Sequence, residues 1–339
     1  MSVRRAVITR SGGPEVFEVR EGAPDALPAD GIRIAVKASG VNFADLMMRM
    51  GMYPEAPKPP FTPGYEVAGE VTEIGSAVLP GKFTKGDRVV AAAKFGAYAS
   101  EITVSIAQAR KMPDAMTWEE GASIPVNWGT AWVALEEMAR VRKGDRVLVH
   151  SAAGGVGVAA VQIAVAAGAT VVGLTGSPAK SQAIRDLGAS DVWSNEEWAG
   201  RDKERFDIII EAIGGAELKR CYSRLQPAGR VVTFGVSSMI GGEKRSILKV
   251  AGTMLKMPFF TPLGLMNANK GIFGLNMLKM FEPDQIERVG SALDHVMDGF
   301  RAKKFRAVVG KTFPLAEAGA AQSHLQSRGN VGKVVLTLP

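Results

Sequence analysis

A glycine-rich turn between an apolar segment and an alanine-rich segment constrains the fold of this chain more than any other feature. Residues 146–150 are apolar enough for a buried strand, and residues 158–167 have the composition of a helix. The turn between them, residues 151–157, matches the glycine fingerprint of dinucleotide-binding loops, with Ala152 in place of its first glycine. Backbone N–H groups at the start of the following helix can bind a pyrophosphate. We expect Gly154 to let a dinucleotide approach and Gly157 to let the helix pack on its sheet. The alternative is a glycine-rich turn without a ligand.

Strand-like and helix-like segments alternate after about residue 123. The strand-like segments are 146–150, 170–174, 206–210 and 230–234, and the helix-like segments between them include 158–167 and 178–187. Repeated strand–helix units are typical of a parallel sheet covered on both faces. The predicted fold class is therefore α/β, with a doubly wound Rossmann sheet as the cofactor-binding domain.

The residues before this region show short β segments separated by glycine and proline, which predict a β-rich domain. These segments are 6–8, 32–36, 66–71 and 88–90. The end of the chain carries a helix-like run and two strand-like runs that can return to this first domain, at 284–297, 307–309 and 333–336. We therefore predict a catalytic domain of residues 1–122 and 275–339 around a cofactor domain of residues 123–274.

The strand after the turn indicates which nucleotide binds. A site for NAD usually places an acidic residue at the end of this strand, where it bonds the ribose hydroxyls. Here residues 146–185 contain no acidic residue, and the strand ends in Thr175, Gly176 and Ser177, with Lys180 after them. Hydroxyl and ammonium groups form charge-assisted hydrogen bonds with a 2′-phosphate. We therefore predict NADP(H) as the cofactor, and the alternative for Lys180 is an ordinary exposed helix lysine.

The composition argues against several other classes of protein. Lys and Arg number 41 and Asp and Glu number 34, which gives a net charge of +7, but the basic residues are scattered among acidic ones. We therefore expect no nucleic-acid partner. Cys221 is the only cysteine, so no intrachain disulfide can form, which fits a reducing compartment. The N-terminus lacks an apolar signal core, and we expect a cytoplasmic protein.

Several further motifs resemble those of one family and occur in its order along nearly the whole chain. They are the segments 40–45, 63–71, 86–89, 129–132 and 332–335. Together with the glycine-rich turn, they resemble the medium-chain dehydrogenase/reductase family in its quinone oxidoreductase branch. Segments 41–45, 242–245 and 269–274 further resemble the synaptic vesicle amine-transport protein homologues. The resemblance implies a GroES-like catalytic domain built from both chain ends, a cleft for nicotinamide and substrate, and a homodimer through the cofactor domains.

Zinc-dependent members of this family place a cysteine and a histidine where this chain has Asn42 and Tyr65. Zinc prefers thiolate, imidazole and carboxylate ligands, so these residues are poor substitutes. The histidines are far apart in the sequence, and we expect His150 to end a strand rather than to bind a metal. We therefore predict no metal. Hydride transfer without a Lewis acid suits an acceptor that delocalises the incoming charge, which predicts a quinone or an enone as the substrate.

The resemblance implies Asn42 as a contact of the cofactor or of the substrate oxygen, and the alternative is a turn-forming asparagine. Tyr65 and Tyr53 are candidate proton donors or pocket walls, with ordinary packing as the alternative. Many quinone reductases have a tyrosine five residues after this asparagine, where this chain has Met47, so water is another candidate proton donor. The residues expected to bind the cofactor are Asn42, Asn127, Thr130, Gly154, Gly155, Val156, Gly157, Thr175, Gly176, Ser177, Lys180, Trp193, Gly214, Phe234, Gly235, Val236, Phe273 and Asn330.

Residues 239–281 are rich in methionine and phenylalanine. Methionine side chains make adaptable apolar surfaces. Such a segment can form a lid over a large apolar substrate, a face that binds a membrane or a partner, or an ordinary packing or dimer contact. A second hypothesis therefore stands beside the NADPH-dependent enzyme, namely a lipid- or membrane-associated binding protein that retains an NADPH site.

Overall fold

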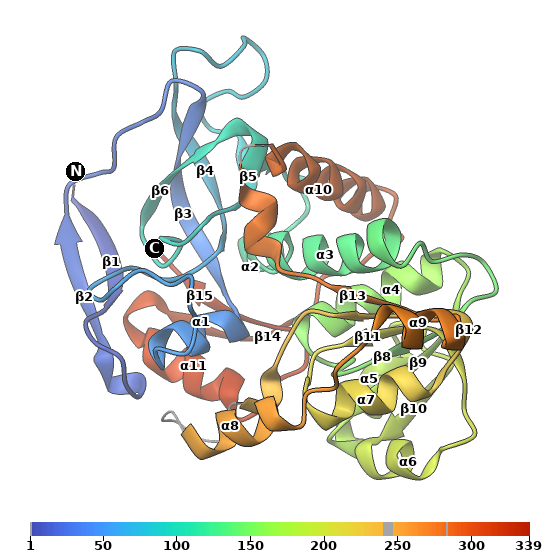
Figure 1. The fold of residues 1–339 in the computed structure, drawn as a ribbon. Helices are drawn as coiled ribbons and strands as arrows, with labels where there is room; N and C mark the ends of the chain where they lie inside the picture. The colour runs from blue at the N-terminus through green and yellow to red at the C-terminus, as the bar shows by residue number, and fades with distance from the viewer. Residues whose placement is uncertain (1, 240–246, 283) are drawn as a thin grey trace. The chain divides into compact units, whose positions relative to one another are not determined.

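The computed structural model describes residues 2–239, 247–282 and 284–339 and divides into two compact units (Figure 1). Within these residues, the first unit comprises the chain up to residue 129 and from residue 278 onward, and the second comprises 130–239 and 247–277. The boundaries expected from the sequence lay a few residues earlier, after 122 and after 274. The motif at 242–245 lies outside the described residues.

A seven-stranded sheet organises the first unit and contains strands from both ends of the chain. Its order is β14-β15-β3-β4-β5-β7, β6 also pairs with β3, and β1 and β2 form a separate hairpin. Strand β15 pairs antiparallel with β3, so that Val334 lies opposite Val41. The strands are β1 (Val3–Ile8), β2 (Phe17–Gly22), β3 (Gly31–Val41), β4 (Glu66–Ile74), β5 (Arg88–Ala92), β6 (Glu101–Ser105), β7 (Ala109–Lys111), β14 (Val309–Pro314) and β15 (Lys333–Thr337).

Apolar residues at alternate positions form the core of this unit. Ile32, Ile34 and Val36 on β3 are buried, as are Val334 and Leu336 on β15. Burial of each such side chain contributes about 1.5–3 kcal/mol, which holds the C-terminal strand in the N-terminal sheet. The helices of this unit are α1 (Phe43–Arg49), α2 (Trp118–Ala122), α10 (Ile286–Arg301) and α11 (Ala318–Gln326). Helix α3 (Pro125–Trp132) begins in this unit and ends in the second.

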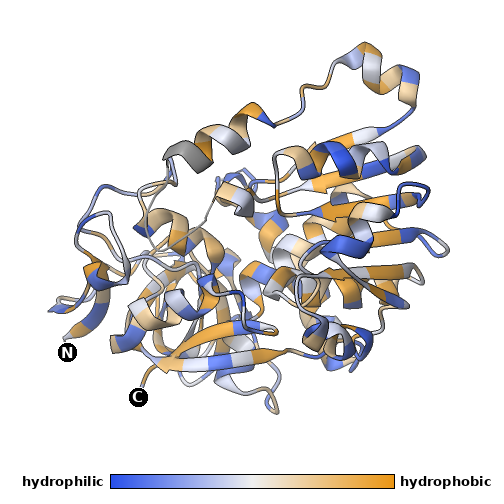
Figure 2. Cartoon of the chain, turned by 90° about the horizontal axis from the view of Figure 1, so that it is seen from below, coloured by the Kyte–Doolittle hydropathy of each residue, from blue (hydrophilic) through white to orange (hydrophobic). Residues whose placement is uncertain are grey.

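The second unit is built on a six-stranded parallel sheet with the order β10-β9-β8-β11-β12-β13. When these strands are numbered 1 to 6 as they follow one another along the chain, their order in the sheet is 3-2-1-4-5-6. This is the strand order of the doubly wound Rossmann fold, and it confirms the predicted fold class. Figure 2 shows hydrophobic residues concentrated along these strands. The strands are β8 (Arg146–Val149), β9 (Thr170–Thr175), β10 (Asp191–Ser194), β11 (Phe206–Glu211), β12 (Leu225–Thr233) and β13 (Gly271–Gly274).

The helices of the second unit differ in part from the predicted ones. The expected helix at 178–187 is a 3₁₀ turn, Pro178–Lys180, followed by the short helix α5 (Ser181–Arg185). The other helices are α4 (Gly155–Ala166), α6 (Asn195–Gly200), α7 (Ala216–Ser223), α8 (Ile247–Leu255), α9 (Pro262–Ala268) and a π-helix at Val133–Met138. Among the described residues, no helix combines the length and the apolar character needed to cross a membrane.

Candidate active site

The turn after β8 has the geometry of a phosphate-binding loop. Gly154 is the N-cap of α4, and the Ala152 N–H donates to the Leu174 carbonyl oxygen at 2.9 Å, which ties the turn to β9. A Cβ on Gly157 would lie 2.3 Å from the Ser151 carbonyl oxygen, whereas the nearest atom to a Cβ on Gly154 would be 3.2 Å away. Gly157 is therefore required by packing. Gly154 leaves open the space in front of helix N–H groups that have no intrahelical acceptor.

Most residues expected to bind the cofactor lie at the carboxyl ends of the strands of this sheet. Because the strands are parallel, their carboxyl ends share one edge, and α/β sheets bind ligands where the strand order reverses, here beside β8. These residues are Gly154, Gly155, Val156 and Gly157 after β8, Thr175, Gly176, Ser177 and Lys180 at and after β9, Trp193 on β10, Gly214 after β11, Phe234, Gly235 and Val236 after β12, and Phe273 on β13. Thr130 is buried and belongs to α3 rather than to the end of a strand.

The end of β9 carries the groups expected to select the nucleotide. The Ser177 N–H donates to Thr175 Oγ1 at 3.2 Å, so the last residue of the strand holds the turn. Partial burial lowers the pKa of the Lys180 ammonium. A Cβ on Gly176 would lie 3.4 Å from Asn195 Nδ2, so Asn195 is a neighbour of this turn that sequence reasoning missed. Asn195 begins α6 directly after β10, so its proximity to the end of β9 follows only from the pairing of β9 with β10.

Trp193 and Phe273 have different environments. The Trp193 indole is 3% exposed and packs against Trp198 and Phe206. The Phe273 ring is 39% exposed. The Trp193 side chain is thus part of the core of the second unit, whereas Phe273 presents a ring to its surroundings.

In the first unit, Asn42 meets two charged side chains that sequence reasoning did not single out. Asn42 Nδ2 donates to Glu66 Oε1 at 2.9 Å, and Lys333 Nζ donates to Asn42 Oδ1 at 2.6 Å. Lys333 also forms an ion pair with Glu66 Oε1, and the Val126 N–H donates to Glu66 Oε2 at 2.8 Å. Glu66 is 0% and Lys333 3% exposed. A carboxylate and an ammonium are thus buried together and satisfied by each other and by Asn42.

Asp45 lies next to this network and has an unusual pKa. Asn42 N and Tyr98 Oη both donate to its Oδ2, at 2.8 and 2.9 Å. Burial nevertheless raises the pKa of Asp45 to about 7, because it disfavours the charged carboxylate more than these hydrogen bonds favour it.

A pH dependence of stability follows from Asp45. The folded protein keeps this proton up to about pH 7, whereas the unfolded chain releases it near the ordinary aspartate pKa of 3.8. The folded state therefore binds more protons between these values, and this group makes the protein less stable as pH rises through the window. We expect Asp45→Asn, measured by Tm between pH 4 and 8, to show a smaller loss of stability with rising pH than the wild type. Equal slopes for the two proteins would contradict the assignment.

The candidate proton donors Tyr53 and Tyr65 lie together in the first unit. Tyr65 is 6% exposed, its hydroxyl donates to Met48 Sδ at 3.5 Å, and Tyr53 packs against the cluster that contains both. Burial raises the pKa of both phenols. Both tyrosines are therefore neutral near pH 7, which is the state that a proton donor requires.

Two further candidate residues of the first unit bond to nearby backbone. Asn127 Nδ2 donates to the Ser123 carbonyl oxygen at 3.2 Å, and Asn330 Nδ2 donates to the Gly332 carbonyl oxygen at 2.7 Å. The amide orientation of each is thus set locally. Their roles toward a cofactor remain predictions.

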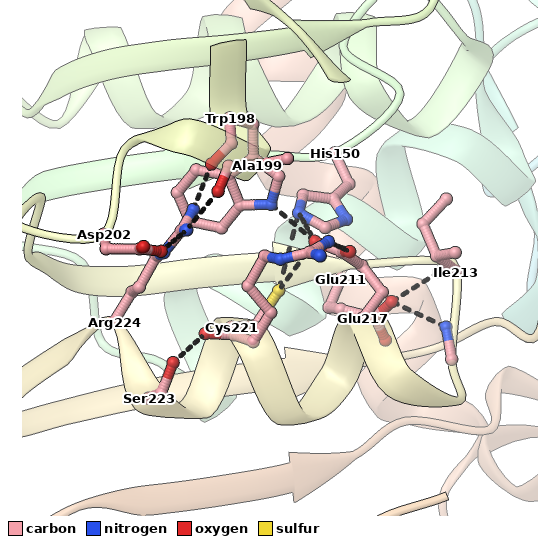
Figure 3. A network of polar contacts seen from close by, with 12 residues as sticks. His150, Trp198, Ala199, Asp202, Glu211, Ile213, Glu217, Cys221, Ser223 and Arg224 are labelled. Atoms are coloured by element: carbon pink, nitrogen blue, oxygen red, sulfur yellow. Dashed lines mark hydrogen bonds and ion pairs between the residues drawn. The ribbon is translucent and has the colours of Figure 1, made fainter. Parts of the chain in front are cut away.

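A polar network in the second unit brings together His150, Cys221 and Glu217 (Figure 3). His150 Nε2 lies 3.5 Å from Cys221 Sγ and 3.7 Å from Glu217 Oε1. Burial raises the pKa of the Cys221 thiol and lowers that of the His150 imidazole, so both are neutral. Glu217 already accepts from the Trp198 indole and from Arg220. The ligand atoms of His150, Glu217 and Cys221 lie within 4.8 Å of one another, but they bond to each other and to Trp198 and Arg220, so the group as it stands is a hydrogen-bond network in the core.

Two family models match the chain. Residues 28–114 match the alcohol dehydrogenase GroES-like domain, and residues 155–277 match the zinc-binding dehydrogenase model. The residues at the zinc-ligand motifs do not fit that metal. Asn42 is bonded to the Lys333 ammonium and Tyr65 is a neutral phenol, neither of which suits zinc, and the Glu66 carboxylate beside Asn42 is paired with the same ammonium.

Relatives match the chain from end to end. The synaptic vesicle membrane protein VAT-1 homolog of Danio rerio is 32% identical over 98% of this chain and 70% of its own length. The quinone oxidoreductase of Sus scrofa is 31% identical over 98% of this chain and 96% of its own length.

Solved structures agree with these matches. The human VAT-1 homolog-like protein has a TM-score of 0.85 at 30% identity, covering 100% of this chain and 98% of its own. The quinone oxidoreductase of Thermus thermophilus, solved alone and with NADPH, has a TM-score of 0.80 at 31% identity, covering 99% of this chain and 100% of its own. The chain therefore belongs to the medium-chain dehydrogenase/reductase family, among whose members the VAT-1 homologues and the quinone oxidoreductases are its relatives.

Proposed function

We propose that this protein is an NADPH-dependent oxidoreductase that transfers hydride to a quinone or an enone without a metal. The observation that carries the proposal is the glycine turn at the reversal point of the Rossmann sheet, with Ser177 and Lys180 at the end of the next strand. The family supports the oxidoreductase activity, and NADPH is bound by the solved Thermus relative named above. When bound, the cofactor supplies a hydride from C4 of its nicotinamide ring.

The side chains that could serve as metal ligands in the two units support a reaction without a metal. Lys333 and Glu66 neutralise each other beside Asn42, and the His150 network is engaged in hydrogen bonds. A conjugated carbonyl spreads the incoming charge over its own π-system, so positioning and a few hydrogen bonds suffice. Tyr53 and Tyr65, neutral at pH 7, are the proposed sources of the proton that completes the reduction, with water as the alternative.

A screen of NADPH oxidation over quinones, enones and aldehydes tests this function. The protein is first treated with a chelator, and absorbance at the NADPH band is followed with each acceptor. We expect turnover with quinones or enones that the chelator does not change. Tight NADPH binding without turnover of any acceptor would instead favour the lipid- or membrane-associated binding protein, for which the exposed apolar residues of α8 and α9 are the supporting observation.

Lys180 is the residue proposed to select NADPH over NADH. Loss of one charge-assisted bond to the 2′-phosphate costs about 1.5–3 kcal/mol, so we expect Lys180→Ala to raise the KM for NADPH roughly tenfold or more. The KM for NADH, which lacks this phosphate, should change little. Lys219→Ala, at an exposed lysine of α7, is the matched control. Equal effects of Lys180→Ala on both cofactors would contradict the assignment.

We propose that the protein is a homodimer formed through its second unit. Among the described residues, β13 is the last strand of the parallel sheet, and large apolar side chains in the chain segment that precedes it are exposed: Leu255 at 88%, Phe259 at 90% and Met266 at 74%. Exposed apolar patches of this kind mark interaction surfaces. Figure 2 shows α8 and α9 extending from the body of this sheet.

Light scattering after gel filtration tests the dimer. The wild type should have twice the chain mass of 35.9 kDa. The double variant Phe259→Glu/Met266→Glu should have the mass of one chain, because two charges would be buried in the contact. Leu79→Glu, at a residue of the first unit that is 75% exposed, is the control and should remain dimeric. A dimeric double variant would place the contact elsewhere.

A further inference from the structure

Glu211 ends strand β11 of the second unit with a carboxylate, and the residue is 0% exposed. The Ile213 and Gly214 N–H groups donate to its Oε1 at 2.5 and 2.7 Å (Figure 3). Thr233, the last residue of β12, donates from Oγ1 to its Oε2 at 2.8 Å. A buried carboxylate is costly unless hydrogen bonds satisfy its oxygens, and here three donors supply them. One side chain thus ties the loop after β11 to its own strand and to β12.

The loop after β11, residues 212–215, also packs closely against the loop after β12, residues 234–238. Three backbone hydrogen bonds of 3.1–3.2 Å run from N–H groups of the second loop to the carbonyl oxygens of residues 211–213. A Cβ on Gly235 would lie 2.9 Å from the Ala212 carbonyl oxygen, so this approach requires glycine. The two loops therefore behave as one piece, which we call the β11–β12 platform.

The platform lies beside the glycine turn in the same sheet. The His150 N–H, directly before the turn, donates to the Ile210 carbonyl oxygen at 3.0 Å, because β8 and β11 are parallel neighbours. A dinucleotide crosses such a sheet where the strand order reverses, with one half of the molecule over each half of the sheet. We place the 2′-phosphate at the end of β9, so the nicotinamide half extends toward β11 and β12. All these residues belong to the second unit.

We propose that Glu211 is a positioning residue whose carboxylate presets the β11–β12 platform for the nicotinamide half of NADPH. This inference rests on the proposed function. Glu211 is buried and acts through the two loops, whose residues 234–236 are only half-buried and can meet a ligand. Without the carboxylate, the two N–H groups lose their acceptor, and the loops must be ordered when NADPH binds. That ordering reduces the affinity.

Two substitutions separate the hydrogen bonds of Glu211 from its size. Glu211→Gln keeps one oxygen for both N–H groups, and its amide NH2 can donate to Thr233 Oγ1, because a hydroxyl also accepts. Glu211→Met has a similar length but no comparable acceptor. Thr233→Val is a milder variant that keeps the shape of the side chain and removes only the bond to β12.

Asp207 offers a matched control at the other end of the same strand. It is also a carboxylate that accepts from a backbone N–H, that of Arg146, at 2.7 Å, and from the Gln226 side chain. Because Asp207 lies at the amino end of β11, away from the edge that carries the glycine turn, Asp207→Ala should lower the Tm and leave cofactor binding unchanged.

The test compares NADPH with adenosine 2′,5′-bisphosphate, which has the adenine and the 2′-phosphate but no nicotinamide half. The Kd of each ligand is measured for the wild type and every variant, well below the lowest Tm. We expect Glu211→Met to weaken NADPH about tenfold and Thr233→Val about threefold, with the bisphosphate changed less than about twofold in both. Glu211→Gln should bind NADPH within about twofold of the wild type.

Equal weakening of both ligands by Glu211→Met, or no weakening of NADPH, would overturn the inference. The same holds if Glu211→Gln or Asp207→Ala loses as much NADPH affinity as Glu211→Met. If Glu211→Met does not fold, Thr233→Val decides, and an NADPH Kd equal to that of the wild type counts against the platform. A wild type that binds NADPH but reduces no acceptor removes the proposed function, while the Kd values still decide the role of Glu211.

Discussion

Gly157→Ala is expected to destabilise the second unit and to abolish NADPH binding. The new Cβ would lie 2.3 Å from the Ser151 carbonyl oxygen and 2.6 Å from Ala152 Cα, both backbone atoms of the phosphate turn. Overpacking typically costs about 1–3 kcal/mol, and a backbone neighbour cannot relieve it by changing rotamer. Either α4 moves away from β8 or the turn opens, and the N–H groups at the start of α4 then no longer converge on one point. Urea unfolding and NADPH titration measure the two losses.

Gly154→Ala is the matched control for this prediction. At Gly154 the φ angle is −79°, and a Cβ would have the Ser151 carbonyl oxygen 3.2 Å away as its nearest neighbour. Alanine needs the turn to give by only a few tenths of an ångström, so stability should change far less than in Gly157→Ala, by less than about 1 kcal/mol. The methyl group does occupy the space where a pyrophosphate would approach, so NADPH affinity should fall roughly tenfold or more. Equal stability losses in the two variants, or normal NADPH binding by Gly154→Ala, would contradict the assigned roles of the two glycines.

Gly40→Ala is expected to destabilise the first unit strongly. Its Cβ would lie 2.4 Å from Glu66 Oε1, 2.5 Å from the Ala122 carbonyl oxygen and 2.6 Å from Lys333 Cε. The methyl group would separate the buried ion pair, and disruption of such a pair costs about 3–5 kcal/mol. The urea midpoint should therefore fall well below that of the wild type.

Gly22→Ala is the control for Gly40→Ala. A Cβ on Gly22, in β2, would meet only Arg5 Nη1 at 3.2 Å, the end of a flexible side chain. Its urea midpoint should match that of the wild type. If the midpoints of the two variants coincide, the close packing around the ion pair does not contribute to stability as described.

The sequence predicted the second unit well because its signals are local. The apolar strands and the glycine turn follow one another within a short stretch, and their order leads to a parallel sheet. Strands β10 and β13 were not predicted, because neither is a continuous apolar run: β10 begins at Asp191 and ends at Ser194, and the glycines at both ends of Gly271–Gly274 disfavour a strand. Their neighbours in the sheet, rather than their own propensity, make them strands.

The Asn42 network could not be predicted in the same way. Glu66 and Lys333 are brought together only when β15 pairs with β3 and β3 pairs with β4. A signal was nevertheless present, since each is a charged residue at the start of an apolar strand, and a buried charge requires a partner. Sequence reasoning recognised both as parts of family motifs and gave a role only to Asn42.

The most direct test of the proposed chemistry is the fate of a deuterium label. NADPH labelled with deuterium at C4 is incubated with the chelator-treated protein and an enone, and the product is analysed by NMR. Hydride transfer predicts deuterium at the β-carbon of the reduced enone when the transferred position of C4 carries the label, with a proton from the protein or from water at the α-carbon. Reduced product without the label from either C4 epimer, or a reaction that stops when metal is removed, would contradict metal-free hydride transfer by this protein.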